Sequence, residues 1–91
     1  MPENSAIVAR ARHAFRNLAN GMYLDSRGDV TPYFETFMGT LEDLPDLVGL
    51  ELYAKWEQLK PHYPIIGNVE QAKIVEDRLR AHAQRYLSAA H

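Results

Sequence analysis

The side chains best suited to bind a metal ion in this chain are its four histidines, and their spacing argues against a metal site. They are His13, His62, His82 and His91. No two of them are four residues apart, and none follows a glutamate at the spacing that places both ligands on one helical face. Helical bundles that hold two metal ions use such pairs together with glutamates from neighbouring helices. The sequence therefore predicts no metal and no other cofactor.

Side chains for covalent or acid–base catalysis are equally scarce. The chain has no cysteine, and Ser5, Ser26 and Ser88 occur at an expected helix start, in a turn and near the carboxyl end. None follows the pattern of a strand-to-helix nucleophile turn, and there is no glycine-rich phosphate loop. The clustered carboxylates Glu42, Asp43 and Asp46 could suggest acid–base work, but they are explained by the favourable position of acids near the start of a helix. The sequence therefore predicts that the protein is not an enzyme.

Charge is unevenly distributed along the chain. The formal net charge is −2, yet from Asp25 to Glu57 eight acids accompany two bases, which gives a local net charge of −6. The remaining residues carry eight bases and four acids, a net of +4. Such asymmetry is informative about association rather than about fold.

Six arginines form a basic candidate surface. Three lie in the first expected helix and three in the last, and they would form one patch if those helices were adjacent. The mildly acidic net charge and the lack of a helix-turn-helix pair with a polar recognition helix argue against nucleic-acid binding. The six residues are Arg10, Arg12, Arg16, Arg78, Arg80 and Arg85.

Composition places the chain among folded proteins, with 46% hydrophobic and 24% charged residues. No run approaches the roughly 18 apolar residues of a membrane span, and the first residues lack the apolar core of a signal peptide. The absence of cysteine agrees with a reducing compartment. These features predict a cytoplasmic protein without membrane attachment.

Apolar residues recur with helical spacing in four segments, which predicts an all-α fold, a small four-helix bundle in one domain over residues 1–91. Thr31 and Pro32 suit a helix cap followed by the first helical residue. Asn68 and Gln71 have the spacing of a capping box. The helices are expected at about 5–23, 32–43, 46–60 and 69–89.

The third expected helix, DLVGLELYAKWEQL, does not keep its apolar residues on one side. At 100° per residue, one stripe contains Val48, Leu52, Trp56 and Leu59. A second stripe, on nearly the opposite side, contains Leu47, Leu50 and Ala54, with Tyr53 between the two. One stripe suffices to pack a surface helix onto a core. The second indicates either a helix covered by neighbours on both sides or a helix that contacts a partner.

The run from Tyr23 to Phe37, YLDSRGDVTPYFETF, resembles the helix–turn–helix entry of small helical bacteriocin immunity proteins. In those proteins an aromatic-leucine helix end leads through a short polar turn into an acidic helix that bears phenylalanine. The resemblance implies an acidic helical inhibitor of bacterial type, which covers a basic nuclease surface by mimicking phosphate charge.

Together, the acidic middle of the chain and the second stripe predict a small protein-binding module. We expect an inhibitor, immunity or regulatory protein that covers a basic surface of a partner, with apolar anchors for affinity and acids for steering. The alternative is a homodimer that buries the same stripe between two copies and uses its arginine faces in a regulatory or nucleic-acid-binding role. The predicted contact residues are Asp43, Asp46, Leu47, Leu50, Glu51, Tyr53 and Glu57.

Overall fold

The computed structural model describes residues 2–24, 30–61 and 68–89 and confirms an all-α bundle, with four α-helices in this part of the chain. The first helix begins at Pro2, earlier than expected, because proline is tolerated in the first turn of a helix. It continues into a π-helical turn, η1. The elements are α1 (Pro2–Ala19), η1 (Asn20–Leu24), α2 (Thr31–Leu41), α3 (Asp46–Leu59) and α4 (Val69–Ala89).

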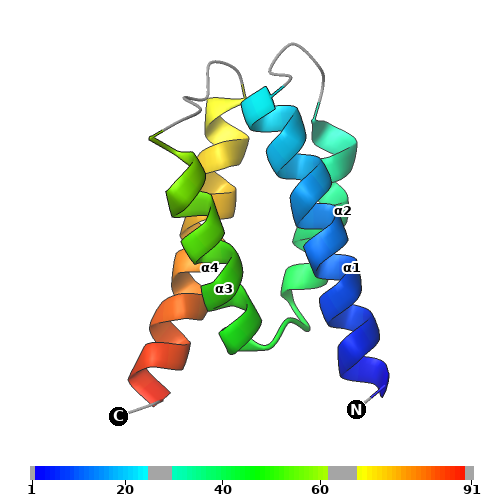
Figure 1. Cartoon of the computed structure of the whole chain (residues 1–91), viewed down its shortest axis with the longest axis vertical. Coiled ribbons are helices and arrows are strands. Elements are labelled where there is room, and N and C mark those ends of the chain that lie inside the picture. Colours follow the sequence, from blue (N-terminus) through cyan, green and yellow to red (C-terminus); the bar gives the residue numbers. More distant parts are fainter. Residues whose placement is uncertain (1, 25–29, 62–67, 90–91) are drawn as a thin grey trace.

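The helices form two antiparallel hairpins, α1 with α2 and α3 with α4, which stand side by side (Figure 1). In the view of Figure 1, α1 and α3 are neighbours in front, and α2 and α4 are neighbours behind them. The connection over residues 42–45 therefore runs diagonally, from α2 at the rear of one hairpin to α3 at the front of the other. Helices α1 and α4 occupy opposite corners, so the adjacency on which a single six-arginine patch depended is not found.

Aromatic side chains join the two hairpins at the centre of the bundle. Phe15 of α1 lies 5.8 Å from Phe37 of α2 and 6.3 Å from Trp56 of α3, measured between ring centroids. The contact with Trp56 is edge-to-face, a geometry that stabilises beyond the burial of area alone. Val75 and Leu79 of α4 are fully buried in the same cluster. All four helices therefore contribute to one core.

The end of α1 depends on a glycine. Ala11, Leu18 and Met22 are fully buried along the stripe that the apolar spacing predicts. Gly21, in η1, packs so closely on the residue before α2 that a Cβ atom there would lie 2.8 Å from Val30 Cγ1. The π-helical turn η1 thus places Met22 in the core and packs Gly21 directly against Val30.

The helix starts differ in detail from the caps that the sequence predicts. Thr31 is the first residue of α2 and not its cap; the cap position belongs to Val30, which has no side-chain cap bond. Gln71 Nε2 donates to Thr31 Oγ1 at 3.2 Å, so this amide links α4 to α2. Asn68 has φ 57°, a left-handed conformation that asparagine tolerates better than most residues. One tertiary contact, between Gln71 and Thr31, therefore uses side chains that local patterns assign to capping.

Candidate partner-binding face

The orientation of α3 is set by its two neighbours, α1 and α4. Leu52 and Trp56 are almost fully buried in the core. Val48 and Leu59 are partly buried and pack against the same cluster. The first apolar stripe of this helix is therefore core, as its spacing predicts.

The second stripe divides into an outer and an inner part. Leu47 is 55% exposed, Ala54 is exposed and Leu50 is half-buried. Tyr53 instead packs partly against the core, and its hydroxyl accepts a hydrogen bond from Arg80 Nε of α4 at 3.4 Å. Helix α3 is thus covered by α1 on one side and by α4 on another, and it leaves Leu47, Leu50 and Ala54 on its outer side.

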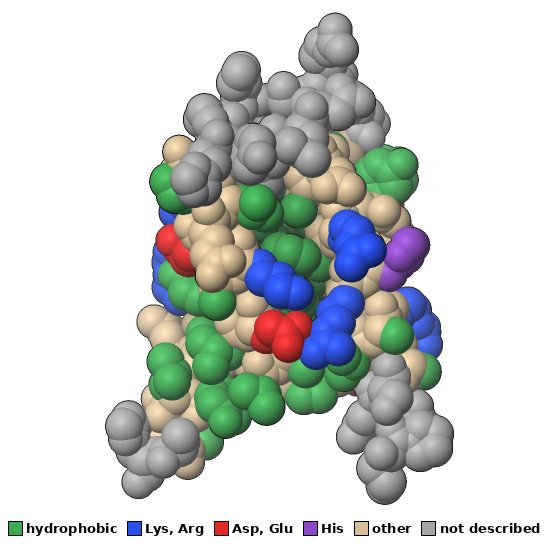
Figure 2. All heavy atoms as spheres, in the orientation of Figure 1, with side chains coloured by type: hydrophobic (Ala, Val, Ile, Leu, Met, Phe, Trp, Pro, Cys, Tyr) green, Lys and Arg blue, Asp and Glu red, His purple; other side chains and the backbone are tan. Residues whose placement is uncertain are grey.

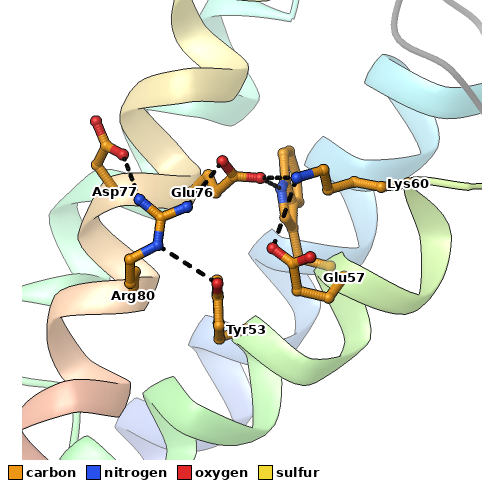
Figure 3. A network of polar contacts seen from close by, with 7 residues as sticks. Tyr53, Glu57, Lys60, Glu76, Asp77 and Arg80 are labelled. Atoms are coloured by element: carbon orange, nitrogen blue, oxygen red, sulfur yellow. Dashed lines mark hydrogen bonds and ion pairs between the residues drawn. The ribbon is translucent and has the colours of Figure 1, made fainter.

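Glu76 of α4 is the centre of a polar network that joins α4 to α3 (Figure 3). One carboxylate oxygen accepts from Lys60 Nζ at 2.6 Å and from Trp56 Nε1 at 3.2 Å, and the other accepts from Arg80 Nη2 at 3.2 Å. The bond from Lys60 is the main cause that lowers the pKa of Glu76 below its ordinary value. Glu57, a predicted partner-contact residue, lies 3.6 Å from Lys60 Nζ in the same network.

Two further acids of the predicted contact set are also paired within the chain. Asp46 Oδ1 lies 2.8 Å from His82 Nδ1 and accepts from Arg85 Nε at 3.3 Å. The two carboxylate oxygens of Glu51 accept from Arg12 of α1 at 2.8 and 2.9 Å. The hydrogen bond with His82 lowers the pKa of Asp46, and that with Arg12 lowers the pKa of Glu51.

The predicted acidic residues therefore do not gather on one surface. Asp43 is exposed and lines a hollow between α1 and α2 together with Arg10. Asp46 and Glu57 are paired on the α4 side, whereas Glu51 is paired with α1. Asp46, Glu51 and Glu57 each lie beside a base of their own chain, which weakens the field that they present to a partner.

The predicted basic residues are divided in the same way. Arg78 and Arg85 line a small hollow between the end of α2 and α4, next to Glu42. Arg80 belongs to the network around Glu76. The remaining three arginines are on α1, and two of them, Arg12 and Arg16, line a groove that α1 shares with α3.

The groove between α1 and α3 has a volume of about 300 Å³. Figure 2 shows it as a hollow with lysine and arginine side chains around it and a carboxylate beside them. The floor is apolar, formed by Phe15, Ala19, Leu52 and Leu59. The rim is polar, formed by Arg12, Arg16, Asn20, Lys55 and Gln58.

Two of the rim cations, Arg16 and Lys55, make no direct ion pair with a described acid. Arg16 and Lys55 are exposed, and neither makes an ion pair within 4 Å or a hydrogen bond with another described residue, although the charge of Lys55 helps to lower the pKa of Glu51. Arg12 is paired with Glu51, whose side chain is 38% exposed. The charged side chains at the groove therefore sum to +2 when Glu51 is included. We call this groove, together with Leu47, Leu50 and Ala54, the α1–α3 face.

Sequence reasoning missed this groove, although it named some of its residues. The i, i+4 spacing of Arg12 and Arg16 places both on one side of α1. This spacing does not show which helix packs beside α1. In the structure that helix is α3, and its Lys55 lies on the other rim of the groove. These charges form one site only because α1 and α3 are neighbours, which the sequence does not reveal.

Two further findings concern metal ligands and membrane-spanning helices in the part of the chain that the structure describes. No group of three or more His, Asp or Glu side chains is placed there to hold a metal ion. His82 is 6% exposed, and its Nδ1 atom contacts Asp46 and Arg85, so it joins α4 to the start of α3. None of the helices in this part of the chain is both long and apolar enough to cross a bilayer.

No protein-family model matches the chain, and comparisons with curated proteins and with solved structures find no match either. The resemblance of residues 23–37 to helical immunity proteins therefore stays a prediction. Residues 25–29 of that run lie outside the described residues.

Proposed function

We propose that the protein is a protein-binding module of inhibitory or regulatory type, and that its contact surface is the α1–α3 face. The observation that carries the proposal is the position of Leu47, which is 55% exposed at the start of α3. Leu47 is not needed to complete the core, because Leu52 and Trp56 of the same helix fill it and are almost fully buried.

A single exposed leucine is ordinary on a protein surface. Here the outer side of α3 continues from Leu47 through half-buried Leu50 and exposed Ala54. The groove with its apolar floor adjoins this side, since Leu59 and Lys55 of α3 line it. Apolar surface bordered by polar side chains is typical of protein contact sites.

Capture of partners by two matched variants tests the proposal. Leu47→Asp and Ile74→Asp each replace an exposed apolar side chain, 55% and 46% exposed, by an acid, but Ile74 lies on α4. We expect the immobilised wild-type chain and Ile74→Asp to retain the same protein from an extract of the source cells, and Leu47→Asp to lose it. Equal retention by all three chains would contradict a contact surface at Leu47.

A second copy of the chain is the other partner that this surface could accept. Sedimentation equilibrium of the purified protein distinguishes the two cases. A dimer that Leu50→Asp converts to monomers would identify the partner as another copy. A monomer whose mass is the same with and without this substitution would support a different protein as the partner.

A further inference from the structure

We propose that the groove between α1 and α3 binds an acidic amphipathic helix of a partner protein. The inference rests on the proposed function, because it names the partner class for the same face. It differs from the expectation of a basic partner surface, which depended on acids that the fold pairs with its own bases.

The shape of the groove suits a helix. It runs between two neighbouring helices, and its floor combines the aromatic side chain of Phe15 with the aliphatic side chains of Leu52 and Leu59. An amphipathic helix fills such a groove with side chains at positions i, i+3 or i+4, and i+7. The volume of about 300 Å³ is at the lower end for a small-molecule site, and it suits a few apolar side chains of a partner.

The charge of the rim selects the sign of that helix. Arg16 and Lys55 make no ion pair within 4 Å among the described residues, and they flank the apolar floor from α1 and α3 respectively. Glu51 attracts Lys55 through its charge, but the groove still carries a net charge of +2. Acidic residues beside the apolar stripe of a bound helix would meet these two cations. The pairing of apolar floor and cationic rim therefore fits an acidic amphipathic segment.

A nucleic-acid strand fits the groove less well. Its phosphates would meet Arg16 and Lys55, but single strands gain much of their affinity by stacking bases on exposed aromatic faces. Phe15 is the aromatic residue of this groove, and it is 6% exposed because Phe37 and Trp56 pack against it. The floor thus offers aliphatic contact without a stacking platform.

Three synthetic peptides test the partner class. Each has 15 residues with leucines at i, i+4, i+7 and i+11, and the flanking positions carry glutamate, glutamine or lysine. Titration of the full chain, followed by amide chemical shifts, measures affinity and locates the site. We expect the glutamate peptide to shift the amides of Phe15, Leu52 and Leu59 and to bind about tenfold more tightly than the glutamine peptide.

Two matched double variants show whether the rim is responsible. Arg16→Gln with Lys55→Gln removes both unpaired rim cations, and Lys73→Gln with Arg78→Gln removes two exposed cations of α4 that also lack ion pairs among the described residues. We expect the first pair to weaken the glutamate peptide about tenfold and the second to leave its affinity unchanged. Circular dichroism confirms that both variants keep their helices.

Three results would overturn the inference: equal affinity for the glutamate and glutamine peptides, tighter binding of the lysine peptide, or tighter binding of single-stranded DNA than of any peptide. These results leave the broader proposal intact if Leu47→Asp still abolishes partner capture. If Leu47→Asp and the wild-type chain instead capture the same partner equally well while the glutamate peptide binds as expected, the role of Leu47 would be contradicted.

Discussion

The contact between Gly49 and His82 allows a prediction of opposite effects at two glycines. Gly49 is buried where α3 crosses α4. A Cβ atom at this position would overlap His82 Cβ and lie 2.7 Å from His82 Cγ. Because the Cβ atom of His82 is bonded to the backbone of α4, rotation of the imidazole cannot remove the overlap. Gly49→Ala therefore requires the two helices to separate.

The expected magnitude follows from two opposing terms. Alanine is favoured over glycine inside a helix by about 1 kcal/mol. Overpacking of a close contact costs about 1 to 3 kcal/mol or more. Separation of the helices also lengthens the 2.8 Å contact between His82 Nδ1 and Asp46 Oδ1. We expect Gly49→Ala to lower the free energy of unfolding by about 2 kcal/mol, out of about 5 to 14 kcal/mol for a chain of this length.

Gly39 provides the matched control. It is an exposed position in α2, and a Cβ atom there meets nothing within 4 Å. Gly39→Ala should therefore raise the free energy of unfolding by about 0.5 to 1 kcal/mol through helix propensity alone.

Urea unfolding, followed by circular dichroism and by the fluorescence of Trp56, measures both changes. With an m value of about 1 kcal/mol per M, Gly49→Ala should lower the midpoint by about 2 M. A stability change of the same sign for both glycines would refute the close packing of α3 on α4.

Two further predictions concern the carboxylates. Glu76→Gln should lower the free energy of unfolding by about 1 to 3 kcal/mol, because it removes the charged acceptor of Trp56 Nε1 and of two cations. As a control, Asp77→Asn should change the free energy of unfolding by less than about 0.5 kcal/mol, because the Asp77 side chain is 53% exposed. The pKa values of Asp46, Glu51 and Glu76 are lowered in the folded chain, so their contribution to stability is present above the unfolded values of about 4 and is lost as the pH falls through the lower folded values. The urea midpoint should therefore fall as the pH decreases from about 5 to about 3, and a constant midpoint would contradict these pairings.

Periodicity was sufficient to predict the four helices and most of their inward faces. Leu18, Met22, Phe37 and Leu79 are buried because each falls on the apolar stripe of its own helix. A stripe depends only on local spacing, which the sequence contains in full. The order of the helices around the core is a different kind of information, because it depends on how the connections cross the bundle.

The outer side of α3 shows where this distinction matters. The helical wheel places Tyr53 between the two stripes, but α4 lies on that side and its Arg80 donates to the tyrosine hydroxyl. The close approach of α4 is possible because Gly49 has no side chain. A wheel records the direction of each side chain but not the distance to the neighbouring helix. For this reason the sequence groups Tyr53 with Leu47, although Leu47 is exposed and Tyr53 packs partly against the core.

Glu51 gives a single substitution whose effect has opposite signs for the two kinds of partner. Its carboxylate binds Arg12 at the rim of the groove, in an ion pair whose side chains are 38% and 50% exposed. Such exposed pairs contribute little to stability, so Glu51→Gln should leave the fold intact. The substitution removes a negative charge beside the groove and frees Arg12 to meet a ligand.

If the partner segment is acidic, Glu51→Gln should tighten binding of the glutamate peptide about threefold, the effect of one unit charge at about 6 to 7 Å in water. If Glu51 instead contacts a basic partner surface, the same substitution should weaken binding of the lysine peptide by a similar factor. Gln58→Glu adds a negative charge at the rim of the same groove and should act in the opposite direction to Glu51→Gln in both titrations. Affinities for both peptides that do not respond to either substitution would show that charge at this groove does not select a partner.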